Sequence, residues 1–300
     1  MNKWIKRTGL AVAALVVVGA SALALGVYLG DRKAQRKIDV RVSPVAIPDD
    51  ATSLARGRYL YASRGCTDCH GASGGGKVFI DDGSMLVKAP NISTGPGSVV
   101  ASYTAEDWVR TIRHGVKPSG QPAFIMPSED YNRLSDADLG AMVAYLKQLP
   151  PAVGGPMEAH IPPPVKALYA FGMIRDAAEK IDHTLPPAGS VVEDGSTRHG
   201  KYVANMCLGC HGPGMSGGKI PGTPPDWPAA SNLTPGEGSA MVRYADAGQF
   251  IAMLRSGKRP DGTAVSAVMP FGSLRELSDA DATALYGYLK ELPPLPAGQQ

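Results

Sequence analysis

The chain has 300 residues, 44% of them hydrophobic and 19% charged, which is long enough for two ordinary domains with hydrophobic cores. Only 6% of the residues are aromatic, whereas glycine (36) and proline (26) are abundant, a composition that favours short helices joined by irregular loops over extensive sheet. Residues 1–37 carry a net charge of +6 out of a total of +3, so residues 38–300 are mildly acidic at −3 and have no basic stripe. Nucleic-acid binding therefore has no support.

The first 37 residues predict a membrane anchor. Residues 9–30 contain no charged side chain and are flanked by basic clusters, and a helix of about 22 residues reaches about 33 Å, enough to cross a hydrocarbon core of about 30 Å. A buried core helix would show a polar stripe, which this run lacks. Ala20, Ser21 and Ala22 keep a cleaved signal peptide open as the alternative, although the apolar run continues past that site. Lysine and arginine counts on the two sides are nearly equal and do not orient the span.

The rest of the sequence repeats itself once. Residues 133–151 return as 276–294, and residues 108–120 return as 250–262, in the same order and with offsets of 142 or 143. Self-similarity of this kind indicates a tandem duplication of a unit of about 100 residues. We expect a first unit at 50–150, a Pro-rich linker at 151–191 and a second unit at 192–295.

Each unit is predicted to be a small set of helices. Residues 54–65 have helical composition, Thr104 with Asp107 resembles a capping box, and Gly115 is suited to end that helix. Ser135 and Ser278 are predicted to cap the last helix of each unit. In the linker, a short helix near 165–181 is expected to belong to an ordinary interdomain spacer.

All four cysteines fall into two C-x-x-C-H motifs, one in each repeat. This motif is the recognised signature of covalent c-type heme attachment, because two thiols on one turn can add to the heme vinyl groups while the histidine faces the iron. A thioredoxin-like pair would need a βαβ setting, and zinc would need both motifs at one metal. The attachment residues are then Cys66, Cys69, Cys207 and Cys210, the proximal iron ligands are His70 and His211, and no disulfide is expected.

The second axial ligand should recur at matching places in both units. Met126 and Met269 do recur, each followed by proline, and we predict that they are the sixth ligands of the two iron atoms. Methionine as a flexible core residue is the alternative. His114 and His199 have no histidine at the equivalent position of the other repeat, so both are expected on the surface, and His160 and His183 lie in the linker.

These motifs resemble two fused class I c-type cytochrome domains, with C-x-x-C-H early, Met-Pro late and a terminal helix carrying Tyr145 or Tyr288. In that family the terminal helix crosses the first helix near a small residue, and Gly57 and Gly200 are suitably placed. The segments "PNIST" and "SNLTP", with the aromatic residues that follow, are similar to cytochrome subunits of membrane-bound periplasmic alcohol, gluconate and sugar dehydrogenases. Those subunits usually carry three hemes, and two motifs are present here.

The resemblance implies a mainly α protein with two tandem class I cytochrome c domains, an N-terminal transmembrane helix and two covalently bound heme c groups. Because bacterial c-type attachment occurs outside the cytoplasm, the heme domains should face the periplasm from the inner membrane. We expect electron transfer between a dehydrogenase or quinol-linked donor and a downstream acceptor or terminal oxidase, with no catalysis of its own, since His and Met fill both axial positions. A diheme peroxidase or sulfur-compound oxidase is the alternative, and it would need one heme with a different ligand or an open position.

Overall fold

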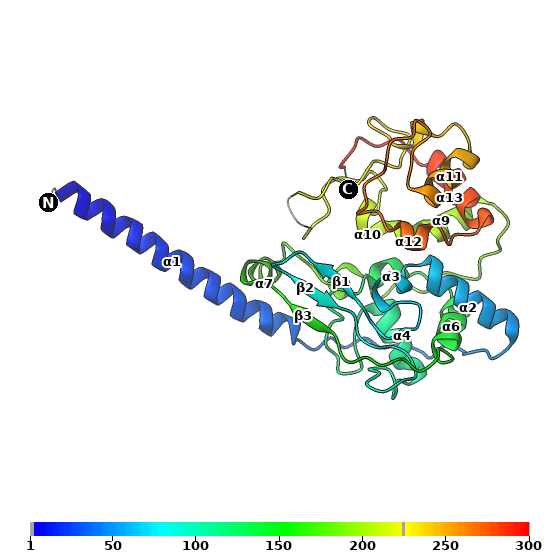
Figure 1. Cartoon of the computed structure of the whole chain (residues 1–300), viewed down its shortest axis with the longest axis horizontal. Coiled ribbons are helices and arrows are strands. Elements are labelled where there is room, and N and C mark those ends of the chain that lie inside the picture. Colours follow the sequence, from blue (N-terminus) through cyan, green and yellow to red (C-terminus); the bar gives the residue numbers. More distant parts are fainter. Residues whose placement is uncertain (1–2, 224–225, 300) are drawn as a thin grey trace.

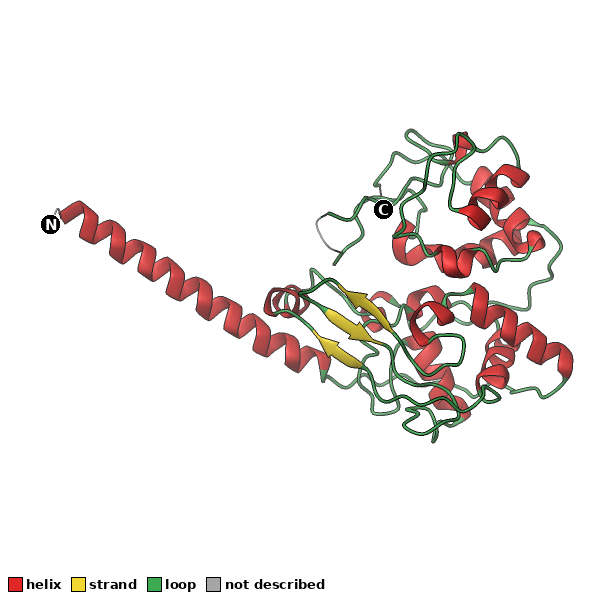
Figure 2. Cartoon of the chain, viewed as in Figure 1, coloured by secondary structure: helices red, strands yellow, loops and turns green. Residues whose placement is uncertain are grey.

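The computed structural model describes residues 3–223 and 226–299. A long helix, α1 (Lys3–Ala34), projects from two helical units that lie one against the other (Figure 1). Helices and loops dominate both units, and the strands found among the described residues all lie with the first unit (Figure 2). The repeat in the sequence is therefore a repeat in space.

The first unit is built on two crossing helices. Its helices are α2 (Ala51–Ser63), α3 (Cys66–His70), α4 (Ala105–His114), α5 (Ser128–Tyr131) and α6 (Asp136–Leu146). Thr104 and Asp107 form the predicted capping box at the start of α4, and Gly115 ends that helix at a φ of 66°. Helix α2 crosses α6 at Gly57, where an added Cβ would lie 2.0 Å from the Ala141 carbonyl oxygen, so only glycine fits this crossing.

The second unit repeats this plan. Its helices are α9 (Thr197–Ala204), η1 (Asn205–Cys207), α10 (Leu208–His211), η2 (Met241–Arg243), α11 (Ala247–Ser256), α12 (Phe271–Leu274) and α13 (Asp279–Glu291). Gly200 stands at the crossing of α9 and α13, with the Ala284 carbonyl oxygen 2.1 Å from where a Cβ would be. Ser278 caps α13 as Ser135 caps α6. Each unit has a hydrophobic core of its own, around Leu60 and Leu285 respectively.

The first unit has a small sheet that the sequence did not predict. Strands β1 (Val78–Asp81) and β2 (Leu86–Lys88) form an antiparallel hairpin, and β3 (Glu158–His160), from the expected linker, pairs antiparallel with β2. Two short helices follow, α7 (Pro163–Ala170) and α8 (Ala177–Lys180), where one helix was predicted. The start of the linker is thus part of the first unit rather than a simple spacer.

Helix α1 is the one described helix that is long and apolar enough to cross a membrane, with a mean hydropathy of 2.5 over its most apolar window. Within it, Gly26 and Gly30 are the buried residues, and both lie near its C-terminal end. The apolar side chains along the rest of α1 are exposed, as is expected of a helix that contacts lipid.

Candidate functional site

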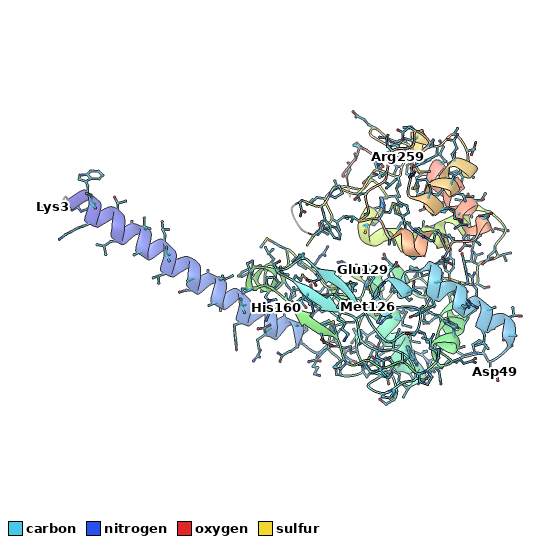
Figure 3. The ribbon with its side chains drawn as sticks, viewed as in Figure 1. Lys3, Asp49, Met126, Glu129, His160 and Arg259 are labelled. Atoms are coloured by element: carbon cyan, nitrogen blue, oxygen red, sulfur yellow. The ribbon has the colours of Figure 1, made fainter. Side chains whose placement is uncertain are left out.

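The first C-x-x-C-H motif opens onto an apolar cavity. Helix α3 carries Cys66, Cys69 and His70 along one side, and Met126, which lies within the first unit (Figure 3), lines the same cavity. The cavity and its mouth hold about 1200 Å³. The other lining side chains are mostly apolar and include Phe79, Ile92, Val100, Trp108, Met142 and Leu146. A large apolar cofactor with a metal reached by histidine and methionine fits this lining.

His70 and His211 are held in the same orientation by backbone carbonyls. The Nδ1 atom of His70 lies 3.0 Å from the Pro90 carbonyl oxygen, and that of His211 lies 2.8 Å from the Ser231 carbonyl oxygen, 141 residues further along the chain in both cases. Burial lowers the pKa of both imidazoles, which favours the neutral form. A neutral imidazole whose Nδ1–H donates to a carbonyl presents its Nε2 lone pair, the arrangement of a metal-binding histidine.

The cysteines lack the properties of a redox-active pair. Burial raises the pKa of the Cys66 and Cys207 thiols to about 12 and that of Cys69 to about 11. Active C-x-x-C pairs show the opposite shift, because the thiolate is the reactive form. Within residues 3–223 and 226–299, no three His, Cys, Asp or Glu side chains lie close enough together to hold a metal ion.

The C-x-x-C-H turn of the second repeat ends with the same backbone conformation as the first. Gly71 and Gly212 follow the two histidines, both at a φ of 74°, and their N–H groups donate to the carbonyls of Thr67 and Leu208. Glycine is favoured at such a positive φ because it has no Cβ. Met269 is partly buried against the core of its own unit, as Met126 is in the first. The structure therefore gives the two repeats matching sets of candidate ligands.

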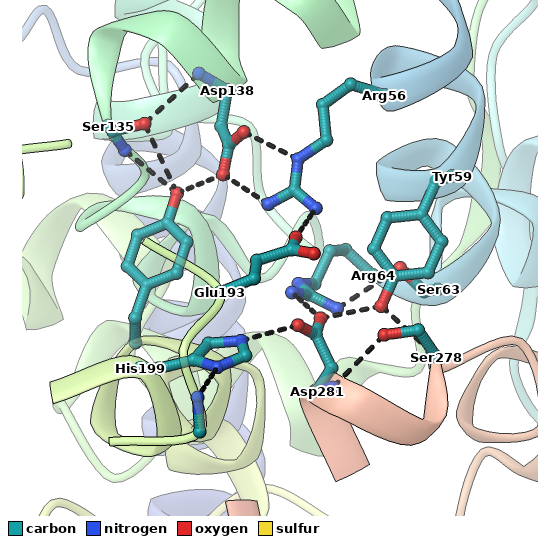
Figure 4. Close-up of polar contacts among 12 residues, drawn as sticks. Arg56, Tyr59, Ser63, Arg64, Ser135, Asp138, Glu193, His199, Ser278 and Asp281 are labelled. Atoms are coloured by element: carbon teal, nitrogen blue, oxygen red, sulfur yellow. Dashed lines mark hydrogen bonds and ion pairs between the residues drawn. The ribbon is translucent and has the colours of Figure 1, made fainter. Parts of the chain in front are cut away.

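The two units meet through a pair of tyrosines related by the repeat (Figure 4). Tyr59 donates to Asp281 Oδ2 at 2.6 Å and accepts from the Ser278 N–H at 3.1 Å. In the mirrored contact, Tyr202 donates to Asp138 Oδ2 at 2.6 Å and accepts from the Ser135 N–H at 3.1 Å. Each tyrosine thus joins the capped helix start of the other unit, and the interface has approximate two-fold symmetry.

Cations compensate the two interface carboxylates. Arg56 binds Asp138 with two hydrogen bonds of 2.8 and 2.9 Å, and Arg64 reaches across to Asp281 at 2.8 Å. Burial opposes ionisation of Asp281, but Arg64, Tyr59 and His199 together lower its pKa to about 2. Both carboxylates are consequently ionised and fully hydrogen-bonded at neutral pH.

The prediction that His114 and His199 lie on the surface is wrong. His199 is 1% exposed and pairs with Asp281 at 2.7 Å, because it takes the place in the second unit that Arg56 takes in the first. His114 is 6% exposed, and its Nδ1 lies 3.0 Å from His183 Nδ1. Burial and the nearby His183 lower the pKa of His114 to about 4, so His114 is neutral at physiological pH.

Each C-x-x-C-H turn also touches the turn that follows the candidate methionine of the other unit. Asp130, four residues after Met126, accepts a hydrogen bond of 2.8 Å from the N–H of Gly209 in the second motif. Burial, and then the charge of Glu129, raises the pKa of Asp130 to about 8. In the reverse direction, Asp68 of the first motif packs on Gly272, where an added Cβ would lie 2.5 Å from its Oδ1. The two C-x-x-C-H turns therefore face the same interface.

Sequence reasoning missed these interface residues, although the repeat contained a signal for them. Tyr59 and Tyr202 are 143 residues apart, as are Asp138 and Asp281. Polar residues that recur in both repeats, outside the heme motifs, are candidates for a symmetric contact between the repeats.

The sequence matches one family model twice and several cytochrome subunits. The family described as "Cytochrome C oxidase, cbb3-type, subunit III" matches residues 52–146 and again residues 195–289. The chain is 27% identical over 83% of its length to the cytochrome c subunit of alcohol dehydrogenase (quinone) from Gluconobacter oxydans (strain 621H). It is 26% identical over 80% to the fructose dehydrogenase cytochrome subunit of Gluconobacter japonicus, and 27% identical over 86% to the gluconate 2-dehydrogenase cytochrome c subunit of Pantoea cypripedii.

These matches cover 57%, 53% and 64% of the three relatives, so the chain spans between about half and two thirds of their length. The double family match confirms the predicted fold class of two tandem, mainly helical cytochrome c domains. The names of the relatives agree with the resemblance drawn from the heme motifs.

Proposed function

The chain belongs to the family of cbb3-type cytochrome c oxidase subunit III, and we propose that it is a membrane-anchored diheme cytochrome that relays electrons through both of its domains. Members of this family bind heme c covalently and transfer electrons. We further propose how many hemes the chain holds, which residues bind their iron atoms and which proteins exchange electrons with it. Bound heme supplies a one-electron redox centre, and the protein residues hold it, order it and set its potential.

In the proposal each domain holds one heme. Cys66 and Cys69 form the two thioether bonds in the first domain, and His70 and Met126 are the axial ligands. Cys207, Cys210, His211 and Met269 have the same roles in the second domain. The carbonyls of Pro90 and Ser231 support this assignment, because they fix the histidine tautomer that a metal needs.

One observation supports electron transfer between the two domains: both C-x-x-C-H turns lie at the interface between them. The Gly209 N–H bonds Asp130, and Asp68 rests on Gly272, so each motif is in contact with the methionine-proximal turn of the other domain. Such an arrangement keeps both redox centres near one shared boundary. An electron can then cross the chain without any step of protein dissociation, which suits a subunit placed between a donor and an acceptor.

We infer that the donor is a dehydrogenase or a quinol-linked protein and that the acceptor is a further cytochrome or a terminal oxidase. The relatives, printed as cytochrome subunits of quinone-type alcohol, fructose and gluconate dehydrogenases, support a donor of this class. Since c-type attachment in bacteria occurs outside the cytoplasm, α1 would cross the inner membrane with both heme domains in the periplasm. With histidine and methionine on each iron, the chain has no catalytic step of its own.

Heme counting tests this function first. A pyridine hemochrome assay on the purified full-length chain should give about two hemes per polypeptide, and a Cys207→Ala/Cys210→Ala variant should give about one. A single heme in the unsubstituted chain would overturn the diheme assignment. Carbon monoxide and peroxide should leave the reduced and oxidised spectra unchanged on mixing, whereas a rapid change at one heme would favour a diheme peroxidase or oxidase.

A further inference from the structure

Helix α7 lies in direct backbone contact with the end of α1. An added Cβ at Gly26 would be 2.7 Å from the Cβ of Ala167, and one at Gly30 would be 2.4 Å from the carbonyl oxygen of Lys166. Any side chain larger than hydrogen at these two positions would push the helices apart. In Figure 1, α7 sits beside the part of α1 that meets the first domain. The linker helix is therefore fixed at one height along the membrane anchor.

A cluster of polar side chains just beyond this contact holds α7 against the end of α1. Arg36 binds Asp176 with two hydrogen bonds of 2.7 and 2.9 Å, and Tyr169 donates to the same carboxylate at 2.5 Å. Lys33 donates to the Tyr169 carbonyl at 2.7 Å. Tyr169 and Asp176 are 1% and 2% exposed, so these charge-assisted bonds are shielded from water and hold α7 firmly to the end of α1.

The contact falls at the level where α1 would leave the membrane. The stretch between Arg7 and Asp31 is free of charge. At 1.5 Å per residue it is about 35 Å long, roughly one helical turn more than a hydrocarbon core of about 30 Å. Tyr28, on this last turn, is 58% exposed, and tyrosine is enriched at the boundary between lipid and water. Gly26 and Gly30 consequently place α7 at that boundary.

The exposed large side chains of α7 and of the turn that follows it are apolar. Leu168, Phe171 and Met173 are 37%, 59% and 59% exposed. Residues 161–175 contain no acidic side chain; of their two basic residues, Lys166 pairs with Asp31 at 2.8 Å and Arg175 is exposed. An exposed apolar group with nearby basic residues is typical of segments that lie in the headgroup region of a bilayer. The ring of Phe171 also lies beside α1, 3.3 Å from where a Cβ of Gly26 would be.

We propose that residues 163–175 are a second membrane contact, inserted among the lipid headgroups and upper acyl chains on the side of the heme domains. The proposal rests on the proposed anchoring of the chain by α1. Strand β3 directly precedes this segment and pairs with β2, and Met157, next to β3, lines the cavity of the first domain. The membrane contact thus fixes the orientation of the first domain, and its heme, relative to the bilayer.

Lipid photocrosslinking tests the inference on the full-length holoprotein. The protein is placed in phosphatidylcholine–phosphatidylglycerol vesicles that contain a phosphatidylcholine with a diazirine near the top of one acyl chain. Trypsin cleavage after Lys166 and Arg175 releases peptide 167–175, and cleavage after Lys180 and Arg198 releases peptide 181–198 from the same linker. Peptide 181–198 contains Val192, which is 72% exposed and serves as the matched apolar control. Peptide 8–32 reports on α1.

We expect lipid adducts on peptides 8–32 and 167–175, at least tenfold above those on 181–198. Adducts on 8–32 without adducts on 167–175 would overturn the inference while leaving the anchor intact. Absence of adducts from 8–32 would instead refute the anchor, and the inference with it. Equal labelling of 167–175 and 181–198 would indicate general surface capture and would also overturn it. In a Phe171→Asp/Met173→Asp variant the adducts on 167–175 should fall at least tenfold, whereas Val192→Asp should change nothing.

Discussion

Removal of the two interface tyrosine hydroxyls should loosen the contact between the domains. The Tyr59 hydroxyl makes a 2.6 Å bond to an ionised carboxylate, Asp281, and accepts a second bond from a backbone N–H. A hydrogen bond to a charged group contributes about 1.5–3 kcal/mol. Because 1.4 kcal/mol is a factor of ten, Tyr59→Phe should lower the ratio of docked to undocked domains roughly 10- to 150-fold. Tyr202→Phe should do the same, and since the hydroxyls share no partner the two effects should nearly add.

The linker provides the assay. Residues 186–193, which run from the linker into the second unit, are held from both domains: Arg133 donates to the Pro186 carbonyl, Arg198 to the Ser190 carbonyl, and Arg56 pairs with Glu193. Undocking should break the bonds from the first domain and free this segment, so that it can enter the active site of a protease that cleaves after acidic residues. We expect cleavage there to accelerate at least tenfold in the double variant, in proportion to the open population, and electron transfer between the hemes after flash reduction to slow.

A matched control separates docking from domain stability. Tyr286 donates to the Tyr244 carbonyl at 3.1 Å inside the second domain, so Tyr286→Phe removes a tyrosine hydrogen bond without touching the interface. This variant should keep the original rates of linker cleavage and of electron transfer. If the Tyr59→Phe/Tyr202→Phe variant also kept both rates, the tyrosines would not hold the domains together and the reasoning would fail.

Three further outcomes follow from the same geometry. Gly57→Ala should lower the melting temperature, because its Cβ would clash with the Ala141 carbonyl. The control is Gly287→Ala: Gly287 has open space around it, so this variant should instead stabilise its helix by up to about 1 kcal/mol in thermal unfolding. Between about pH 4 and pH 2 the free energy of unfolding should fall by on the order of 2–3 kcal/mol, because the pKa of Asp281 is lower in the folded than in the unfolded state. The stabilisation by Asp281 is complete above the unfolded pKa and is lost as the pH falls through about 2. In melting curves, Asp281→Asn should weaken this dependence of stability on pH. N-terminal sequencing should find the uncleaved segment, whereas a mature start near residue 23 would mean a processed chain without the anchor.

Local signals in the sequence were sufficient for the helices and the motifs. Thr104 and Asp107 fix the start of α4 through bonds within three residues, and Ser135 and Ser278 cap their helices in the same way. The heme motifs are equally local, and the repeat made it possible to compare one half of the chain with the other. These features depend on neighbours in sequence, which is why they were predictable.

The contacts that were missed join residues far apart in the sequence. His199 was expected on the surface because nothing near it in sequence suggests a partner, whereas Asp281 lies 82 residues away. Strand β3 pairs with a hairpin about 70 residues earlier, and its own sequence has no strand signal strong enough to predict that. The docking of α7 at Gly26 likewise depends on two segments more than 100 residues apart, so it required the folded chain.

The central claim is that Met126 and Met269 each bind a heme iron and that both hemes lie on one electron route. The direct measurement is a redox titration of Met126→His and of Met269→His, combined with turnover in native membranes. Each substitution should lower the potential of one heme by more than about 60 mV, a factor of ten for one electron, leave the other heme unchanged and slow turnover. A variant whose potentials stay the same would show that its methionine is not a ligand, and a shifted potential with unchanged turnover would place that heme off the route.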